Sequence, residues 1–202
     1  MSQITLINRT DEVVRLALFR MPVLRPTLDA IAWRIASPPP GGSTIVELPS
    51  SLAVRGRYSG DPGNPSLLDT STAAVAFDET TAVFSIDSVA SQDRRTTAAV
   101  ITQKYTDLVM NEVRIFNNYG IGVEVSILGD GDPIYAPQVV WPGGLLLEDV
   151  RSPIHVAVVA GFTFKGQRMV QEEFSQTQTE ALPGGVLVLT GSQWKGYALS
   201  AE

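Results

Sequence analysis

The residues with the clearest chemical potential are one histidine and several acidic and aromatic side chains near glycine or proline. His155 is the only histidine among the 202 residues, and it lies inside the apolar run at residues 154–159. A Ser-His-Asp triad would have to use it, but no Gly-x-Ser-x-Gly motif accompanies it. We therefore expect His155 to be a hydrogen-bonded strand residue, and we expect no enzymatic activity.

Two aspartates, Asp130 and Asp132, flank a glycine, and Glu148 and Asp149 follow further along the chain. Carboxylate oxygens are the ligands that Ca²⁺ prefers. Asp and Gly are also the residues that a tight turn selects, and the spacing of an EF-hand loop is absent. A turn is the favoured interpretation and calcium binding the alternative, and we expect no resident metal or cofactor.

Aromatic side chains in exposed loops can contact a sugar or a protein surface. Trp194 stands in a turn that contains glycine, and Tyr197 follows it on the same predicted strand face. Tyr58 and Tyr119 are further aromatic residues close to glycine. Packing in the core is the simpler interpretation for Trp194. The candidate ligand-binding residues are Trp194, Tyr197, Tyr135, Asp130 and Asp132.

The chain repeats itself. Residues 4–8 and 14–18 return as residues 113–117 and 123–127, so that Asn8 and Asn117 are 109 positions apart (117 − 8), as are Val14 and Val123 (123 − 14). Trp33 followed by Pro-Gly-Gly at 40–42 is answered by Trp141 followed by Pro-Gly-Gly at 142–144. Two copies of one unit are the simplest explanation, and we expect both tryptophans to be core residues.

Apolar residues alternate with small or charged ones along most of the chain, which is typical of half-buried strands. Pro-Gly-Gly occurs three times, and each triplet is predicted to begin a strand, at residues 43–48, 145–149 and 186–190. We expect hairpins within residues 186–199, 98–110 and 72–86. The predicted fold is all-β, with two tandem antiparallel β-sandwich units, Ig-like or jelly-roll-like, related by internal duplication over residues 1–110 and 111–202. One larger sandwich of two halves is the alternative.

Composition narrows the classes of partner. Charged residues make up 18% of the chain and the net charge is −6, without a basic cluster, so we expect no nucleic-acid partner. The chain has no cysteine, no signal-like start and no apolar run long enough to span a bilayer. We expect a protein that is cytoplasmic as synthesised, with signal-independent export as an alternative.

Three functions remain open at this point. The leading hypothesis is a structural or self-assembling protein whose subunits, in a homo-oligomer or a larger assembly, pair through unguarded strand edges at residues 145–147 and 186–189. The second is a lectin-like module that binds carbohydrate or a cell surface through loops. A membrane-acting toxin is the third, because alternating strands are also compatible with a barrel.

Overall fold

The computed structural model describes residues 2–25, 28–61, 64–72, 74–76, 81–90, 97–107, 112–170 and 178–202. All regular elements in these ranges are β-strands, so the all-β prediction is confirmed. No helix in the described ranges has the length and apolar character needed to cross a membrane.

Contacts divide the chain into two compact units, and each unit draws on separate stretches of sequence. Unit 1 consists of Met1–Met21, Asp29–Ser50 and Ser152–Glu202, whereas unit 2 consists of Pro22–Leu28 and Ser51–Arg151. This division differs from the boundary expected near Asn111, because the two ends of the chain fold together in unit 1.

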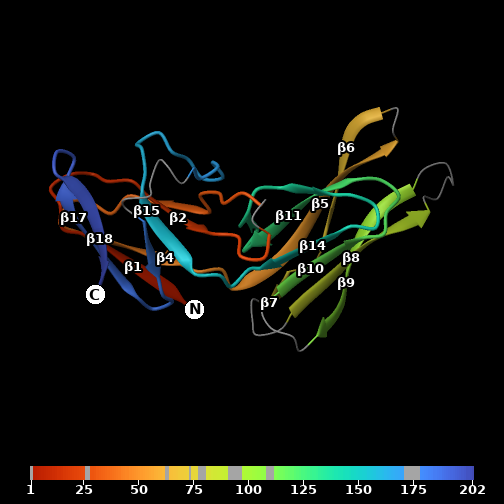
Figure 1. Ribbon diagram of the computed structural model, residues 1–202, viewed down its shortest axis with the longest axis horizontal. Helices are drawn as coiled ribbons and strands as arrows, with labels where there is room; N and C mark the ends of the chain where they lie inside the picture. The colour runs from red at the N-terminus through yellow and green to blue at the C-terminus, as the bar shows by residue number, and fades with distance from the viewer. Residues whose placement is uncertain are drawn as a thin grey trace. The chain divides into compact units, whose positions relative to one another are not determined.

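Unit 1 contains two four-stranded sheets, with strand orders β18-β17-β1-β4 and β16-β15-β2-β3. Its strands are β1 (Gln3–Asn8), β2 (Leu16–Arg20), β3 (Arg34–Ala36), β4 (Ser43–Glu47), β15 (Ile154–Val158), β16 (Gln178–Ala181), β17 (Val186–Ser192) and β18 (Gly196–Ala201). Figure 1 shows the red β1 in the same part of the molecule as the blue β17, and these two strands pair in parallel.

Unit 2 also contains two sheets, with orders β14-β10-β8-β9 and β12-β11-β5-β6, and β13 and β7 pair with β11 and β5. Its strands are β5 (Ser51–Asp61), β6 (Asn64–Ser71), β7 (Val75–Ala76), β8 (Thr81–Ala90), β9 (Thr97–Asp107), β10 (Glu112–Asn117), β11 (Val123–Gly129), β12 (Asp132–Pro133), β13 (Gln138–Val140) and β14 (Leu145–Asp149).

The two units share one pairing pattern, down to the register. β1 lies between a parallel neighbour, β17, and an antiparallel one, β4, and β10 lies in the same way between β8 and β14. Leu16 on β2 faces Ala36 on β3, and the residue 109 positions after Leu16, Val125, faces Gln138 on β13. Apolar side chains of both sheets are buried in each unit, among them Leu6 and Leu18 in unit 1.

The Pro-Gly-Gly prediction is confirmed at all three places. β4, β14 and β17 each begin directly after a triplet, and the middle glycines, Gly41, Gly143 and Gly184, have φ values of 67°, 72° and 79°. A positive φ is strained for any residue with a Cβ atom, so glycine is the residue that these turns require.

Several sequence predictions about pairing need correction. The hairpin of β17 and β18 is confirmed, but residues 98–107 form part of one continuous strand, β9, and the part of the predicted hairpin beyond it lies outside the described residues. Within residues 72–86, β7 pairs with β5 and β8 pairs with β9 and β10, so the described residues form no hairpin there. β17 is not a sheet edge, because β1 and β18 flank it, whereas β14 does end its sheet in the described pairings.

Trp33 is buried as predicted, but Trp141 is 69% exposed. The two tryptophans lie on opposite sides of matching strands. Trp33 precedes β3, whereas Trp141 follows β13, the strand that matches β3 by register. The buried residues ahead of β13 are Ile134 and Tyr135, each 1% exposed.

Candidate functional site

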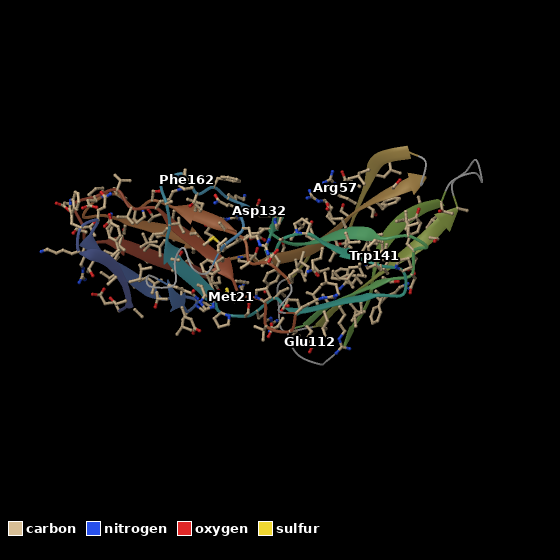
Figure 2. The ribbon with its side chains drawn as sticks, turned by 45° about the horizontal axis from the view of Figure 1, so that its top comes forward. Met21, Arg57, Glu112, Asp132, Trp141 and Phe162 are labelled. Carbon is tan, nitrogen blue, oxygen red and sulfur yellow. The ribbon has the colours of Figure 1, made fainter. Side chains whose placement is uncertain are left out.

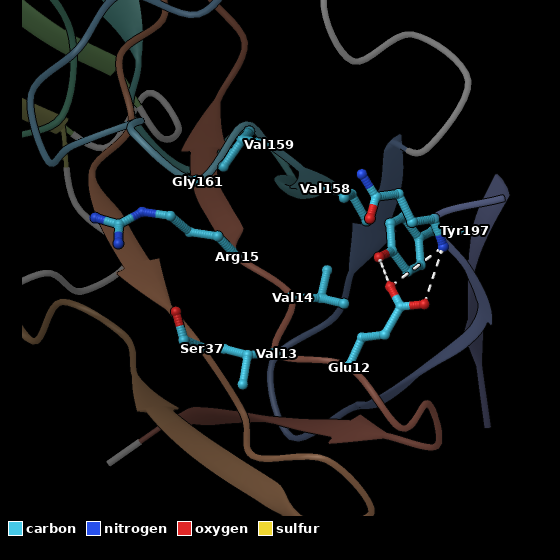
Figure 3. A pocket seen from close by; sticks show the side chains of 10 residues that line it. Glu12, Val13, Val14, Arg15, Ser37, Val158, Val159, Gly161 and Tyr197 are labelled. Atoms are coloured by element: carbon cyan, nitrogen blue, oxygen red, sulfur yellow. Dashed lines mark hydrogen bonds between the residues drawn. The ribbon is translucent and has the colours of Figure 1, made fainter.

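A cleft of about 610 Å³ lies within unit 1, a volume in the range of small-molecule sites, roughly 300–1,000 Å³. We call it the unit 1 cleft (Figure 3). The turn between β1 and β2, the ends of β3 and β15, and the hairpin of β17 and β18 supply its walls. Its lining residues are Glu12, Val13, Val14, Arg15, Ser37, Val158, Val159, Gly161, Gln193 and Tyr197.

Asn8 shapes the turn that presents Glu12. The Asn8 side chain is fully buried, and its Nδ2 donates to the carbonyl oxygens of Glu12 (2.9 Å) and Pro38 (3.0 Å). Its Oδ1 accepts from the backbone N–H of Thr10 at 2.9 Å. Asn117 makes the matching bonds to Ile121, Val140 and Tyr119 in unit 2.

Glu12 connects the two loops at one end of the cleft. Its carboxylate accepts the hydroxyl hydrogen of Tyr197, and it also accepts from the backbone N–H of Gln193, with N to Oε2 at 3.2 Å. Figure 3 shows these bonds between Glu12 and the β17–β18 hairpin. The hydrogen bond to Glu12 is the main cause that raises the pKa of Tyr197 to about 12, with burial and the negative charges of Glu12 and Asp11 adding to it.

A titration of Tyr197 tests this bond. We expect the Tyr197 phenol to stay protonated up to about pH 12, whereas a Glu12→Gln variant should let it ionise closer to the ordinary value of 10.0. The measurement is the ultraviolet absorbance of ionised tyrosine, with Tyr197→Phe subtracted to isolate one phenol. Identical titration curves for the wild type and Glu12→Gln would contradict the bond.

Arg15 marks a different part of the cleft. Figure 3 shows its side chain extending away from Glu12 and Tyr197. Among the described residues its Nε is buried without a hydrogen-bond partner. A buried donor without a partner costs about 1–3 kcal/mol, so Arg15 carries a local cost in unit 1. The cleft therefore offers a carboxylate and a phenol at one end, a guanidinium at another, and valine side chains between them.

Exposed aromatic residues follow the lining residues in sequence. Trp194, next to Gln193, is 92% exposed, which corrects the core interpretation and leaves the predicted contact role open. Phe162, next to Gly161 and labelled in Figure 2, is 81% exposed. Single exposed apolar side chains are normal on protein surfaces, so the exposure alone does not assign a partner to either residue.

The predicted ligand-binding residues are divided between the two units. Trp194 and Tyr197 belong to unit 1, whereas Tyr135, Asp130 and Asp132 belong to unit 2. Tyr135 is buried, and its hydroxyl donates to the carbonyl oxygen of Asp149 at 3.2 Å, so its assignment to an exposed rim is wrong. Tyr58 and Tyr119 are buried as well, with their rings edge to face at 5.4 Å.

Asp130 serves a turn, which is the interpretation that the sequence favoured. It has a φ of 50°, and its Oδ1 accepts from both the backbone N–H and the hydroxyl of Ser51 at 2.8 Å. Asp132 is half-buried on β12. Within the described ranges, no group of three or more His, Cys, Asp or Glu side chains is placed to hold a metal ion.

His155 is a bonded strand residue on β15, as predicted. Its ring stacks on Phe19 with centroids 5.7 Å apart, and its Nδ1 lies 2.7 Å from Nε2 of Gln178. With the Gln178 amide in this orientation its nitrogen donates and Nδ1 accepts, which corresponds to a neutral ring with its proton on Nε2. Burial lowers the pKa of His155 below 6.5, although Glu180 opposes this shift.

The lowered pKa of His155 predicts a dependence of stability on pH. The unfolded state takes up a proton at a higher pH than the folded state does, so this contribution is complete above pH 6.5 and is lost as the pH falls below it. Urea unfolding at pH 7.5 and 5.5 should show a smaller loss of stability for His155→Gln than for the wild type. Equal losses would contradict a neutral, buried His155.

Sequence reasoning missed Glu12 and Arg15 as site residues. The repeat held one usable signal. Glu12 matches Ile121 in the second copy, so a charged residue stands in one turn where an apolar residue stands in the other. A departure of this kind from a repeat indicates a local role.

Comparisons of the chain with family models, with curated proteins and with solved structures give no match.

Proposed function

We propose that the protein is a non-enzymatic binding module, and that the unit 1 cleft takes a ligand with several hydroxyl groups, of the carbohydrate class. The observation that carries the proposal is the cluster of Glu12, Gln193 and Tyr197 at the unit 1 cleft. Trp194, which directly follows Gln193 in the chain, is almost fully exposed. Sugars present hydroxyl groups for polar side chains and an apolar face for an aromatic ring.

The two ends of the cleft fit this class of ligand. Hydroxyl groups both donate and accept, so a ligand with several of them could donate to the Glu12 carboxylate and accept from the guanidinium of Arg15. Val14 and Val158 between these ends suit the C–H face of a sugar ring. A purely anionic ligand would meet the Glu12 carboxylate, and a purely cationic one would meet Arg15.

Tryptophan fluorescence tests the proposal, after a glycan array has selected the best sugar. We expect titration with that sugar to change the emission of the wild type, and we expect Trp194→Ala and Glu12→Gln to weaken binding by about tenfold or more. Trp141→Ala is the matched control, because Trp141 is also exposed but lies in unit 2, and it should bind as the wild type does. An array without signal and a titration without change would contradict the proposal.

Self-assembly through a strand edge is the second candidate function, and β18 is the observation that favours it. β18 ends its sheet, is mostly exposed and carries no charged residue over Gly196–Ala201. Natural edge strands are usually protected by charge, proline or a bulge. Ser200→Lys would place a charge on this edge and should dissociate assemblies seen by light scattering, whereas Thr190→Lys on β17 should leave them intact.

We also infer that each unit is a β-sandwich, and that the two arose by duplication of one module. The matching registers of β1 with β17 and of β10 with β8 support this inference, as do the matching Asn8 and Asn117 turns. Duplicated modules conserve such contacts because each copy needs the same core.

A further inference from the structure

Each unit is built from two blocks of consecutive strands. Unit 1 joins β1–β4 to β15–β18, and unit 2 joins β10–β14 to β5–β9. By register, β1 matches β10 and β17 matches β8. We therefore call β1–β4 and β10–β14 first blocks, and β5–β9 and β15–β18 second blocks. Along the chain the two types alternate, so that each copy of the repeat is a first block followed by a second block. Each second block pairs with the first block that is not its own: β5–β9 completes β10–β14, and β15–β18 completes β1–β4.

We propose that the block at residues 152–202 is exchangeable, and that a second copy of this chain supplies it to β1–β4 in a strand-exchanged dimer. Such a dimer would use the same β1–β17 and β2–β15 pairings that unit 1 already contains. Exchange of this kind needs no new surface, because every contact is one that the chain makes within itself.

The bonds of Glu148 indicate which block moves. The segment Pro22–Leu28, which belongs to the first block by sequence, is part of unit 2. Glu148 on β14 accepts from the backbone N–H groups of Val23 at 2.8 Å and Arg25 at 3.0 Å, which ties this segment to unit 2. Residues 152–202 contribute no segment to unit 2.

The connection at this place is short. Only residues 150–153, which include Pro153, separate β14 from β15. Four residues span at most roughly 14 Å, and the connection between β4 and β5, residues 48–50, is shorter still. Short connections of limited freedom favour exchange between copies, and the bonds of Glu148 select the later block.

The expected order of folding leaves time for a second copy to bind β1–β4. Most of unit 2 is contiguous, whereas Thr5 on β1 pairs with Val186 on β17, 181 positions away (186 − 5). Pairings of such long sequence separation form late. Until β15–β18 arrives, β1–β4 keeps its apolar face open, and at high concentration another copy competes for it.

Cysteine cross-linking between chains tests the proposal, since the natural chain has no cysteine. Thr5→Cys and Val186→Cys are made in separate full-length chains, which are mixed in denaturant and refolded together. A disulfide between the two chains requires β1 of one copy to pair with β17 of another. Because capture by a second copy is bimolecular, we expect the cross-linked fraction to rise by at least about tenfold between 5 µM and 500 µM protein.

Matched pairs calibrate the experiment. The double variant Thr5→Cys/Val186→Cys should cross-link within one chain at low concentration, which establishes that the two positions can bond. Arg114→Cys and Val83→Cys occupy the equivalent register positions in unit 2 and should cross-link only when both are in one chain. Equal inter-chain cross-linking at both pairs would overturn the assignment to residues 152–202.

Light scattering of the refolded natural chain is an independent reading of the proposal. A dimer that appears only after refolding at high concentration, and that persists on dilution, supports exchange. A monomer at every concentration, together with no inter-chain cross-link, overturns it. Edge pairing at β18 cannot produce the 5–186 cross-link. The experiment also does not involve sugar binding, so a failure of the strand-exchange proposal is distinguishable from a failure of the proposed function.

Discussion

Replacement of Glu148 by alanine is expected to destabilise the protein by about 2–4 kcal/mol. Glu148 is fully buried, and besides Val23 and Arg25 it accepts from the backbone N–H groups of Leu24 at 3.1 Å and Asp149 at 3.0 Å. Hydrogen bonds to a charged group are worth more than neutral ones, and alanine leaves all of these donors without their acceptor. Water can reach Val23 and Leu24, which are exposed, and this keeps the loss below the sum of the single bonds.

The measurement is urea unfolding followed by circular dichroism, combined with chymotrypsin cleavage after Leu24. Glu148→Gln keeps one carbonyl oxygen and should lose less than Glu148→Ala. Glu47→Ala, on the exposed side of β4, is the surface control and should stay within about 0.5 kcal/mol of the wild type. Unchanged stability and unchanged cleavage in Glu148→Ala would show that the carboxylate does not hold this segment.

The strands themselves were predictable, because successive side chains of a strand point to opposite faces and apolar residues therefore recur at every second position. Val123, Val125 and Ile127 alternate in the sequence and are all buried on β11. The same holds for Leu16 and Leu18 on β2. The Pro-Gly-Gly turns were predictable for a similar reason, since their positive φ is a demand on single residues. Whatever depends on a few neighbouring residues can be read from the chain.

The partners of these strands were not predictable. A repeat makes β1 and β10 alike, so β17 and β8 are equally suitable partners for either by pattern alone. Which partner each strand takes depends on connection length and on the order of folding, and neither can be seen in the alternation of apolar and polar residues. The tandem division at residue 110 followed from the assumption that each copy folds with itself.

Trp141 illustrates a second limit. Its place before Pro-Gly-Gly resembled the place of Trp33, but Trp33 precedes β3 whereas Trp141 follows β13, the strand that matches β3. Identity of residue type is therefore a weaker guide than register.

The candidate site was half predictable. Trp194 and Tyr197 were named because aromatic residues in a hairpin are visible in the sequence. Glu12 was not, because its role depends on the β17–β18 hairpin, which reaches it from 181 positions further along the chain (193 − 12). Loops that are far apart in the sequence and meet only in the folded unit share no sequence pattern that would indicate their contact.

Val188→Lys is expected to unfold unit 1, at a cost of about 4 kcal/mol or more. Val188 is 3% exposed and lies between Ile7 on β1 and Ser200 on β18. An ammonium group at this position has no carboxylate among its register partners, and a domain has only about 5–15 kcal/mol of stability in total. This strand was first read as a free edge, where the same substitution would have prevented assembly and left the fold intact.

Hydrogen exchange read by mass spectrometry distinguishes the two outcomes. We expect Val188→Lys to remove protection from β1, β17 and β18 together, because β17 joins the other two. Thr190→Lys is the matched control, since it adds the same charge to an exposed position of the same strand and should change stability by less than about 0.5 kcal/mol. Equal amide protection in the two variants would contradict the position of β17 between β1 and β18. It would also contradict the β1–β17 pairing on which strand exchange depends.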